Sequence, residues 1–495
     1  MRQMLILSVL LAMLPSDTQS MESGSPLPVG RFSLKMPQLD QMRLANDGRH
    51  LLVASESHRV CRWDLLKRKK LSQVDLPNPL DARIALSPDG QSVIFAQINK
   101  PLRIFDATTS KERDRIPGAV KRIRTIEVSP DGTMVCTGGL SSVQIWNLRR
   151  RKVWSLPGIG KRVKQATFTQ DGRYLLTQSS HALILWDLKQ RKKHHTIFVA
   201  REVSTSIAIS PLGKFVARNG KQAMLWKISK RKLMAERISG TILFPIRIRF
   251  LPDTQTWLII QRGAVQLFDL LTDGPIGDEL ELGFDCQFAE VSRRGDRLIC
   301  VDARGELGIF DLTMMQSGKV EDLQKQWERL ASIDRVQAYR ARWELLSRPK
   351  LAIQVIPPQL QVVPKARDKK IVMWIQELAD DSYVKRETAQ RRLLKQGPDL
   401  IPLVQKVLNE KLTLEVRRRL RKILTLLNRE SQKQNRNHQL SRVMTVLLQM
   451  GTPEAKSFLR KLSRGATSSA ITQRARAALE KWPRFQRLVR LARKE

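Results

Sequence analysis

The stretch Leu183-Ile184-Leu185-Trp186-Asp187-Leu188 recurs in varied form through the first two-thirds of the chain. In most copies apolar residues lead to an aromatic residue, and an Asp or Asn follows it. Consecutive aromatic residues are separated by 42, 41, 40, 40, 42 and 42 positions. The chain therefore contains seven copies of one unit, and we expect the aromatic residues to be structural: Trp63, Phe105, Trp146, Trp186, Trp226, Phe268 and Phe310.

A turn signal recurs with the same period, about fourteen residues before each aromatic. Examples are Pro88-Asp89-Gly90 and Pro130-Asp131-Gly132. Asp-Gly supplies the positive φ angles that a tight hairpin requires, and Pro presets the first corner. A strand-like run follows each turn, then a strand that carries the aromatic, then another strand. Units of about 41 residues with four short strands are typical of propeller blades.

On these repeats, residues 31–313 resemble a seven-bladed WD40-type β-propeller. No Gly-His dipeptide precedes the Asp-Gly turns, so the hydrogen-bonded tetrad typical of such blades is not assumed and packing is expected to contribute more. The fourth strand of the last blade is missing after Asp311. We expect Arg31-Phe32-Ser33-Leu34-Lys35-Met36 to supply it and close the ring, which removes both exposed sheet edges.

Charge is the unusual bulk property of this chain. Its 495 residues contain 88 Lys and Arg against 47 Asp and Glu, a formal net charge of +41. This balance predicts attraction to polyanions without naming one. The length predicts more than one domain.

The N-terminus resembles a secretory signal peptide over residues 1–20, followed by a short linker over 21–30. Arg2 precedes an apolar run from Met4 to Leu14, and the polar Thr18-Gln19-Ser20 follows. The apolar run is too short to span a bilayer comfortably. Cleavage before Met21 would make the protein periplasmic or secreted; without cleavage it would be membrane-tethered or cytoplasmic.

The cysteines form no recognisable framework, because the sequence has no Cys-x-x-Cys. Cys61 and Cys136 fall in different units, and we expect them to be buried. Cys286 and Cys300 fall on neighbouring strands of the last blade, at positions whose side chains should point to the same face of the sheet. A disulfide between them is left open.

From Val320 onward the apolar residues recur with helical spacing. The segments 383–395 and 399–409 resemble a HEAT-type helix pair. We expect a helical HEAT-like domain over 320–430, a polar mobile linker over 431–438 and basic helices over 439–495. The predicted fold class is therefore multidomain, all-β followed by all-α.

Two further stretches resemble the C-terminal helical region of a family of exported bacterial WD-repeat proteins. They are Val384-Lys385-Arg386-Glu387-Thr388-Ala389 and Met450-Gly451-Thr452-Pro453-Glu454-Ala455. This resemblance implies architecture and export, and it implies no chemistry.

No constellation of side chains predicts catalysis. Ser179-Ser180-His181 lacks a converging base and an oxyanion donor. His194 and His195 are adjacent, so on a strand they should point apart, and no third ligand is nearby. The sequence shows no Gly-rich phosphate loop, zinc spacing or calcium loop. We predict no catalytic residue, no metal site and no cofactor, and we interpret the chain as not an enzyme.

Four clusters of cations follow the aromatic residue of their unit, in the hairpin before the fourth strand. Because these hairpins emerge on one face of a propeller, we predict a shared basic rim that binds an anion, although solvation alone would explain them equally well. The predicted anion-binding residues are Lys67, Arg68, Lys69, Lys70, Arg149, Arg150, Arg151, Lys152, Arg191, Lys192, Lys193, Lys230, Arg231 and Lys232.

Together these features favour an exported, non-catalytic scaffold that binds other proteins and whose basic surfaces bind an anionic envelope polymer or membrane surface. The first alternative is a cytoplasmic WD40 scaffold that binds nucleic acid, with an affinity that falls steeply with salt. The second is an enzyme with its site in the propeller channel. The lack of converging acids, His or Cys argues against the second.

Overall fold

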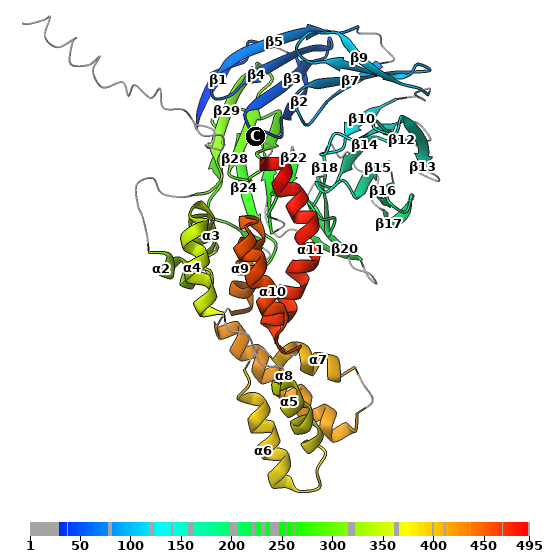
Figure 1. Ribbon diagram of the computed structural model, residues 1–495. Helices are drawn as coiled ribbons and strands as arrows, with labels where there is room; N and C mark the ends of the chain where they lie inside the picture. The colour runs from blue at the N-terminus through cyan, green and yellow to red at the C-terminus, as the bar shows by residue number, and fades with distance from the viewer. Residues whose placement is uncertain are drawn as a thin grey trace, which may run out of the picture.

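A computed structural model of the protein (Figure 1) shows a β-propeller followed by a helical region. The structure describes residues 29–36, 38–77, 82–118, 120, 123–139, 142–156, 163–179, 181–198, 206–219, 223–228, 233–237, 247–253, 255–261, 263–272, 274–314, 322–360, 366–397, 400–409, 412–434, 436–467 and 469–493. The predicted signal peptide and most of the predicted linker that follows it lie outside these residues.

The propeller has seven antiparallel sheets, one for each sequence unit, which confirms the predicted fold. Blades 1 to 3 consist of β2 (Leu39–Leu44), β3 (His50–Ser55), β4 (Arg59–Asp64) and β5 (Lys69–Asp75); β6 (Ala82–Leu86), β7 (Ser92–Gln97), β8 (Leu102–Asp106) and β9 (Glu112–Ile116); and β10 (Thr125–Val128), β11 (Met134–Gly138), β12 (Val143–Asn147) and β13 (Lys152–Leu156).

Blades 4 to 7 follow the same order, except that two short strands share the outer edge of blade 6. They consist of β14 (Gln165–Phe168), β15 (Tyr174–Gln178), β16 (Ala182–Asp187) and β17 (Lys192–Phe198); β18 (Ile207–Ile209), β19 (Phe215–Arg218), β20 (Met224–Ile228) and β21 (Leu233–Arg237); β22 (Arg247–Phe250), β23 (Thr256–Ile260), β24 (Ala264–Asp269), β25 (Gly274–Pro275) and β26 (Leu280–Glu281); and β27 (Phe288–Val291), β28 (Arg297–Val301) and β29 (Glu306–Asp311).

The N-terminal strand β1 (Gly30–Ser33) closes the ring, as predicted. It pairs antiparallel with β29 from Gly30 opposite Ile309 to Ser33 opposite Glu306. Blade 7 therefore takes its outermost strand from the start of the chain, and β29 is not left as a free edge.

The acid after the aromatic residue shapes the hairpin that follows it. In blade 4 the Asp187 carboxylate accepts the backbone N–H groups of Lys189 and Gln190 at 3.0 and 3.1 Å. Asp64 and Asp106 accept the equivalent N–H groups in blades 1 and 2. A short acidic side chain that satisfies its own turn explains why this position repeats.

The helices form two packed groups. The helices are α2 (Leu323–Arg329), α3 (Arg335–Ser347), α4 (Pro349–Gln359), α5 (Ala366–Glu377), α6 (Tyr383–Leu394), α7 (Ile401–Val407), α8 (Leu414–Gln434), α9 (Arg436–Met450), α10 (Pro453–Ser463) and α11 (Ala470–Arg493). Helices α2–α4 share one hydrophobic core with α9–α11. Helices α5–α8 have a core of their own and project from the molecule (Figure 1), and we call this group the α5–α8 lobe.

This packing differs from the predicted division of the helical region. Residues 431–434 belong to α8 and residues 436–438 to α9, so the predicted polar linker is helical wherever it is described. Glu, Gln, Lys and Arg are good helix formers, so a polar composition does not exclude a helix. Helix α6 packs on α5 and α8, and α7 packs on α8, so the two predicted helices 383–395 and 399–409 belong to a four-helix core. No helix among the described residues is long and apolar enough to cross a membrane.

Candidate interaction surfaces and the propeller–helix junction

Two kinds of connection emerge on the same side of the propeller. Because consecutive strands of a blade run antiparallel, the turn between its first and second strands and the hairpin between its third and fourth leave the sheet at the same end. We call this side the hairpin face. The hairpins of blades 1, 3 and 4 span residues 65–68, 148–151 and 188–191, between the strands that flank them.

The predicted anion-binding residues of these three blades are exposed. Six lie in the hairpins, as predicted: Lys67, Arg68, Arg149, Arg150, Arg151 and Arg191. The other five lie at the start of the fourth strands: Lys69, Lys70, Lys152, Lys192 and Lys193. The remaining three, Lys230, Arg231 and Lys232, lie outside the described residues. The predicted rim is therefore solvent-accessible in three blades, and its binding to an anion stays a prediction.

One arginine in each hairpin has a second role that the sequence did not indicate. Arg68, Arg151 and Arg191 end their hairpins with left-handed backbone φ angles of 49°, 51° and 54°. Arg151 donates to the Asp114 carboxylate at 2.7 Å and to the Arg115 carbonyl at 2.6 Å, both on the outermost strand of blade 2. Blades 2 and 3 are thus joined at their outer edges.

The other two arginines lie over aromatic rings of the preceding blade. The Arg191 guanidinium lies 4.6 Å from the centre of the Trp154 ring in β13. The Arg68 guanidinium lies 6.0 Å from the centre of the Phe32 ring in β1. Both distances are those of cation–π contacts. Three of the predicted anion-binding residues therefore also connect neighbouring blades.

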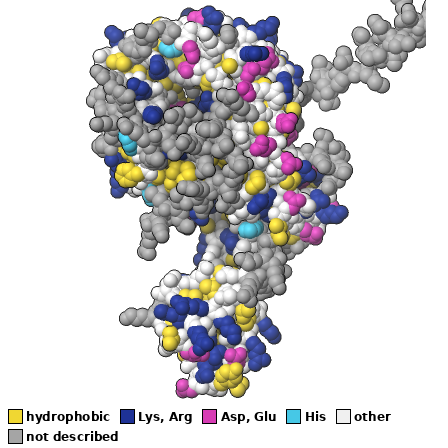
Figure 2. Space-filling model, turned by 180° about the vertical axis from the view of Figure 1, so that it is seen from behind, with side chains coloured by type: hydrophobic (Ala, Val, Ile, Leu, Met, Phe, Trp, Pro, Cys, Tyr) yellow, Lys and Arg dark blue, Asp and Glu magenta, His cyan; other side chains and the backbone are white. Residues whose placement is uncertain are grey.

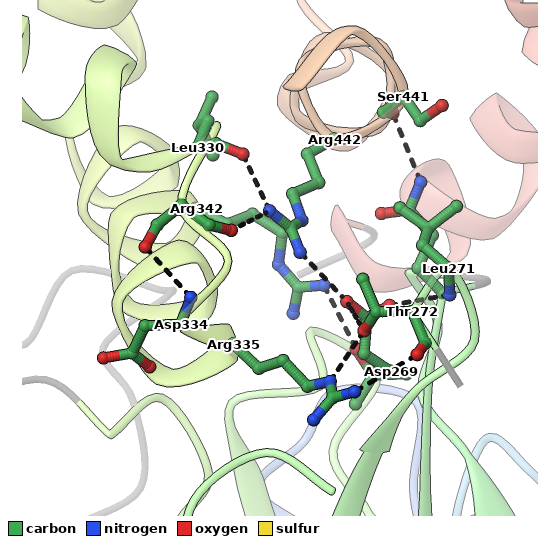
Figure 3. Close-up of polar contacts among 12 residues, drawn as sticks. Asp269, Leu271, Thr272, Leu330, Asp334, Arg335, Arg342, Ser441 and Arg442 are labelled. Carbon is green, nitrogen blue, oxygen red and sulfur yellow. Dashed lines mark hydrogen bonds and ion pairs between the residues drawn. The ribbon is translucent and has the colours of Figure 1, made fainter. Parts of the chain in front are cut away.

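The helical region docks on the same hairpin face, at blade 6 (Figure 3). Arg442 of α9 contacts the Asp269 carboxylate at 3.2 Å and donates to the Leu330 carbonyl at 2.8 Å. Arg335 of α3 donates to the Thr272 hydroxyl at 2.8 Å. No sequence pattern predicts that these segments pair.

The centre of this junction is a buried ion pair. The guanidinium of Arg342 in α3 contacts the Asp253 carboxylate in the first turn of blade 6, with exposed side-chain fractions of 4% and 1%. Tyr339 and Trp343 flank Arg342, with ring centres 4.6 and 5.3 Å from its guanidinium. Both rings belong to the hydrophobic cluster of blades 6 and 7. Burial raises the pKa of the Tyr339 hydroxyl.

A second contact of the helices lies at blade 5. Lys481 of α11 is close to Lys214, which follows the first turn of that blade. Burial, and then the neighbouring Lys214, lowers the pKa of the Lys481 amine to about 8. The Lys481 side chain of α11 therefore lies next to blade 5.

Arginine and glutamate side chains from several blades meet at the central channel. The first strands of successive blades lie side by side around it. The Arg43 guanidinium lies 2.9 Å from the Glu127 carboxylate of blade 3, and Arg249, Arg247 and Glu290 are close enough to interact electrostatically within this group. Burial raises the pKa of Glu127. Arginines and glutamates that partly compensate one another are typical of a structural ion network.

One prediction about His194 and His195 is wrong. Leu185 pairs with His195 while Trp186 pairs with Lys193, so His194 is the extra residue of a β-bulge. The bulge turns the two rings toward each other, with centres 4.5 Å apart. No cluster of three His, Cys, Asp or Glu side chains able to hold a metal occurs in the described part of the chain.

All four cysteines are buried and free of disulfides. Burial raises the pKa of the Cys300 thiol, and its neighbour Cys286 raises it further. The two thiols are therefore neighbours, as their positions on the last blade predicted, without a bond between them.

The α5–α8 lobe is rich in exposed cations. Figure 2 shows Lys and Arg side chains gathered on the lobe in the view from behind. Exposed cations on α8, on α6 and directly after α6 include Arg391, Lys395, Arg418, Arg421 and Lys422. The lobe is a second cationic surface, separate from the hairpin face.

The architecture defines a WD40-type seven-bladed propeller joined to a helical region. The family model for the "WD domain, G-beta repeat" matches residues 111–147. This match runs from the outermost strand of blade 2 through the first three strands of blade 3.

Several proteins share limited similarity with the chain, among them the following two. "Transcription factor unc-37" of Caenorhabditis elegans is 28% identical over 120 residues, which cover 24% of this chain and 20% of that protein. "Protein groucho" of Drosophila melanogaster is 28% identical over 111 residues, covering 22% and 15%. The chain thus spans a fifth or less of the length of these curated relatives.

Proposed function

We propose that the protein is a non-catalytic, exported scaffold that binds other proteins through its propeller and an anionic envelope polymer or membrane surface through its cations. The observation that carries this proposal is the division of the hairpin face. Buried ion pairs hold the helices on blade 6, while the cationic hairpins of blades 1, 3 and 4 are exposed. One face thus combines a fixed helical attachment with an accessible basic rim.

The binding proposal is tested by removing charge from the rim without disturbing the blades. Variant A changes Lys67, Lys69, Lys70, Arg149, Arg150 and Lys152 to Ser, and leaves Arg68 and Arg151 in place because they contact neighbouring blades. We expect variant A to bind polyphosphate chains and anionic vesicles at least about tenfold more weakly than the wild-type protein. Its melting temperature should be unchanged, because exposed charges contribute little to stability.

The matched control removes the same number of cations from the α5–α8 lobe. Variant B changes Lys369, Arg391, Lys395, Arg418, Arg421 and Lys422 to Ser, all of them exposed. If variants A and B lose equal affinity, net charge alone governs binding and the rim is not a site.

Export is tested by N-terminal sequencing of the chain recovered from each cell fraction. A start near Met21 outside the cytoplasm supports the proposal. A start at Met1 in the soluble cytoplasm contradicts it and favours the nucleic-acid-binding alternative. The net charge of +41 and the name of the relative unc-37, a transcription factor, support that alternative.

A further inference from the structure

The junction between the propeller and the helices contains a small, partly open cavity of about 20 Å³. It lies between blade 6, α3 and α9, and its wall includes Thr256, Asp269, Arg335, Tyr339, Arg342 and Arg442. This volume has room for one water molecule or one ion of similar size. Larger ligands, including phosphate esters, do not fit.

The cavity wall has more positive than negative charge. Arg342 is paired with Asp253, and Arg442 is paired with Asp269. Within the described part of the chain, Arg335 donates to the hydroxyl and the carbonyl of Thr272, both of them neutral groups. Among the described residues, three guanidinium groups thus meet two carboxylates in a partly buried site. An uncompensated charge in such a place is unfavourable.

Unused donors mark the same position. The Nε and Nη2 atoms of Arg342 and the Oη atom of Tyr339 are buried and have no hydrogen-bond partner among the described residues. Both residues form part of the cavity wall. A buried donor without a partner destabilises the folded protein, so the site favours any species that accepts these hydrogen bonds.

We propose that this cavity binds one small monovalent anion of the chloride type. Such an anion accepts hydrogen bonds from the Arg342 and Tyr339 donors and balances the charge that Arg335 adds. A water molecule would accept the same hydrogen bonds and leave that charge in place, which favours the anion. The bound anion touches the propeller and two helices at once, and its occupancy strengthens the docking of the helical region.

The direct test is diffraction from crystals of the full chain grown in sodium bromide, with data collected at the bromine absorption edge. We expect an anomalous peak in the cavity bounded by Arg335, Arg342 and Arg442. A cavity that contains water and no anomalous peak at high bromide concentration overturns the proposal.

Melting temperatures in different salts test whether the bound anion stabilises the folded protein. At constant ionic strength and pH, we expect bromide or chloride to raise the melting temperature by about 2–4 °C relative to gluconate, which is too large to enter. Equal melting temperatures in the three salts count against the site.

The variant Arg335→Met tests the charge argument while sparing both ion pairs. With two guanidinium groups and two carboxylates left, we expect the bromide peak and the anion dependence of the melting temperature to disappear. The control Arg59→Met removes an exposed arginine that pairs with Asp75 on blade 1, and it should retain both. A bromide peak that persists in Arg335→Met contradicts the proposal.

Discussion

At the residue scale, one hydroxyl distinguishes otherwise similar blades. Trp186 donates its indole N–H to the Thr177 hydroxyl at 2.9 Å, and Trp146 donates to Thr137 at 3.0 Å. In blade 1 the register places Val53 at the corresponding position, and the Trp63 indole N–H is buried without a partner. Part of the polar network of WD40-type blades therefore persists in blades 3 and 4 although the Gly-His pair is absent.

This difference predicts unequal losses of stability for two reciprocal substitutions. Thr177→Val leaves the Trp186 indole N–H buried without an acceptor, which should lower the free energy of unfolding by about 1–3 kcal/mol. Val53→Thr supplies the Trp63 indole with an acceptor and should cost much less. Denaturant unfolding of both variants measures the two values. Equal losses would show that the hydroxyl has no special role in these blades.

A pH-dependent contribution is expected at the outer edge of blade 2. Hydrogen bonds from Arg115 and then Arg103 lower the pKa of Glu112 to about 2. A carboxyl whose folded pKa lies below its unfolded value stabilises the protein above the unfolded pKa, near 4.5, and loses this effect as pH falls toward 2. Glu112→Gln should be destabilised at pH 6, by at most about 1 kcal/mol because the pair is near the surface. The gap to wild type should close as the pH falls from 4.5 to 2; a gap that is independent of pH contradicts this account.

Residue roles were the hardest feature to predict from sequence. A hairpin arginine such as Arg151 looks like a solvated cation, because its partners Asp114 and Arg115 belong to another unit. The β-bulge at His194 could not be predicted either. One extra residue in a strand changes the direction of a side chain, and no sequence motif marks it here.

At the element scale, the docking of α3 on blade 6 depends on the buried pair of Arg342 and Asp253. Asp253→Asn should destabilise the protein by about 3–5 kcal/mol, because it leaves the Arg342 charge buried without a counterion. The double variant Arg342→Met with Asp253→Asn should recover part of that loss. A double-mutant cycle on melting temperatures measures the coupling. Additive effects would mean that the two groups do not interact.

Strands were easier to predict than helix pairings for a physical reason. Each strand has an alternating pattern and a turn at a fixed distance, and its partner is the next strand along the chain. Helix α4 instead shares a core with α9 and α10, which follow the entire α5–α8 lobe. Amphipathic helices show which face is buried and do not show the partner that covers it.

At the scale of the whole molecule, the junction joins Asp269 with Arg442 across 173 residues of sequence. Nothing in either segment specifies the other, so the position of the helical region on the hairpin face could not be predicted. The period of the repeats, by contrast, determines the number of blades and the closure by β1. The sequence predicted where the cationic rim lies but not what it binds. A positive net charge indicates attraction to anions in general and does not identify one partner.

The separate cores predict that the molecule unfolds in two parts. The propeller and α3 share the hydrophobic cluster that contains Tyr339 and Trp343, so they should unfold together. The α5–α8 lobe has its own core around Leu420 and Ile423, so it should unfold separately.

Leu420→Ala removes a fully buried side chain from the core of the lobe, which typically costs about 2–5 kcal/mol. Calorimetry should show that it lowers the transition of the lobe alone, while Trp343→Ala lowers the transition of the propeller and leaves that of the lobe in place. A single transition that both variants shift equally would mean that the lobe and the propeller form one cooperative unit, despite their separate cores.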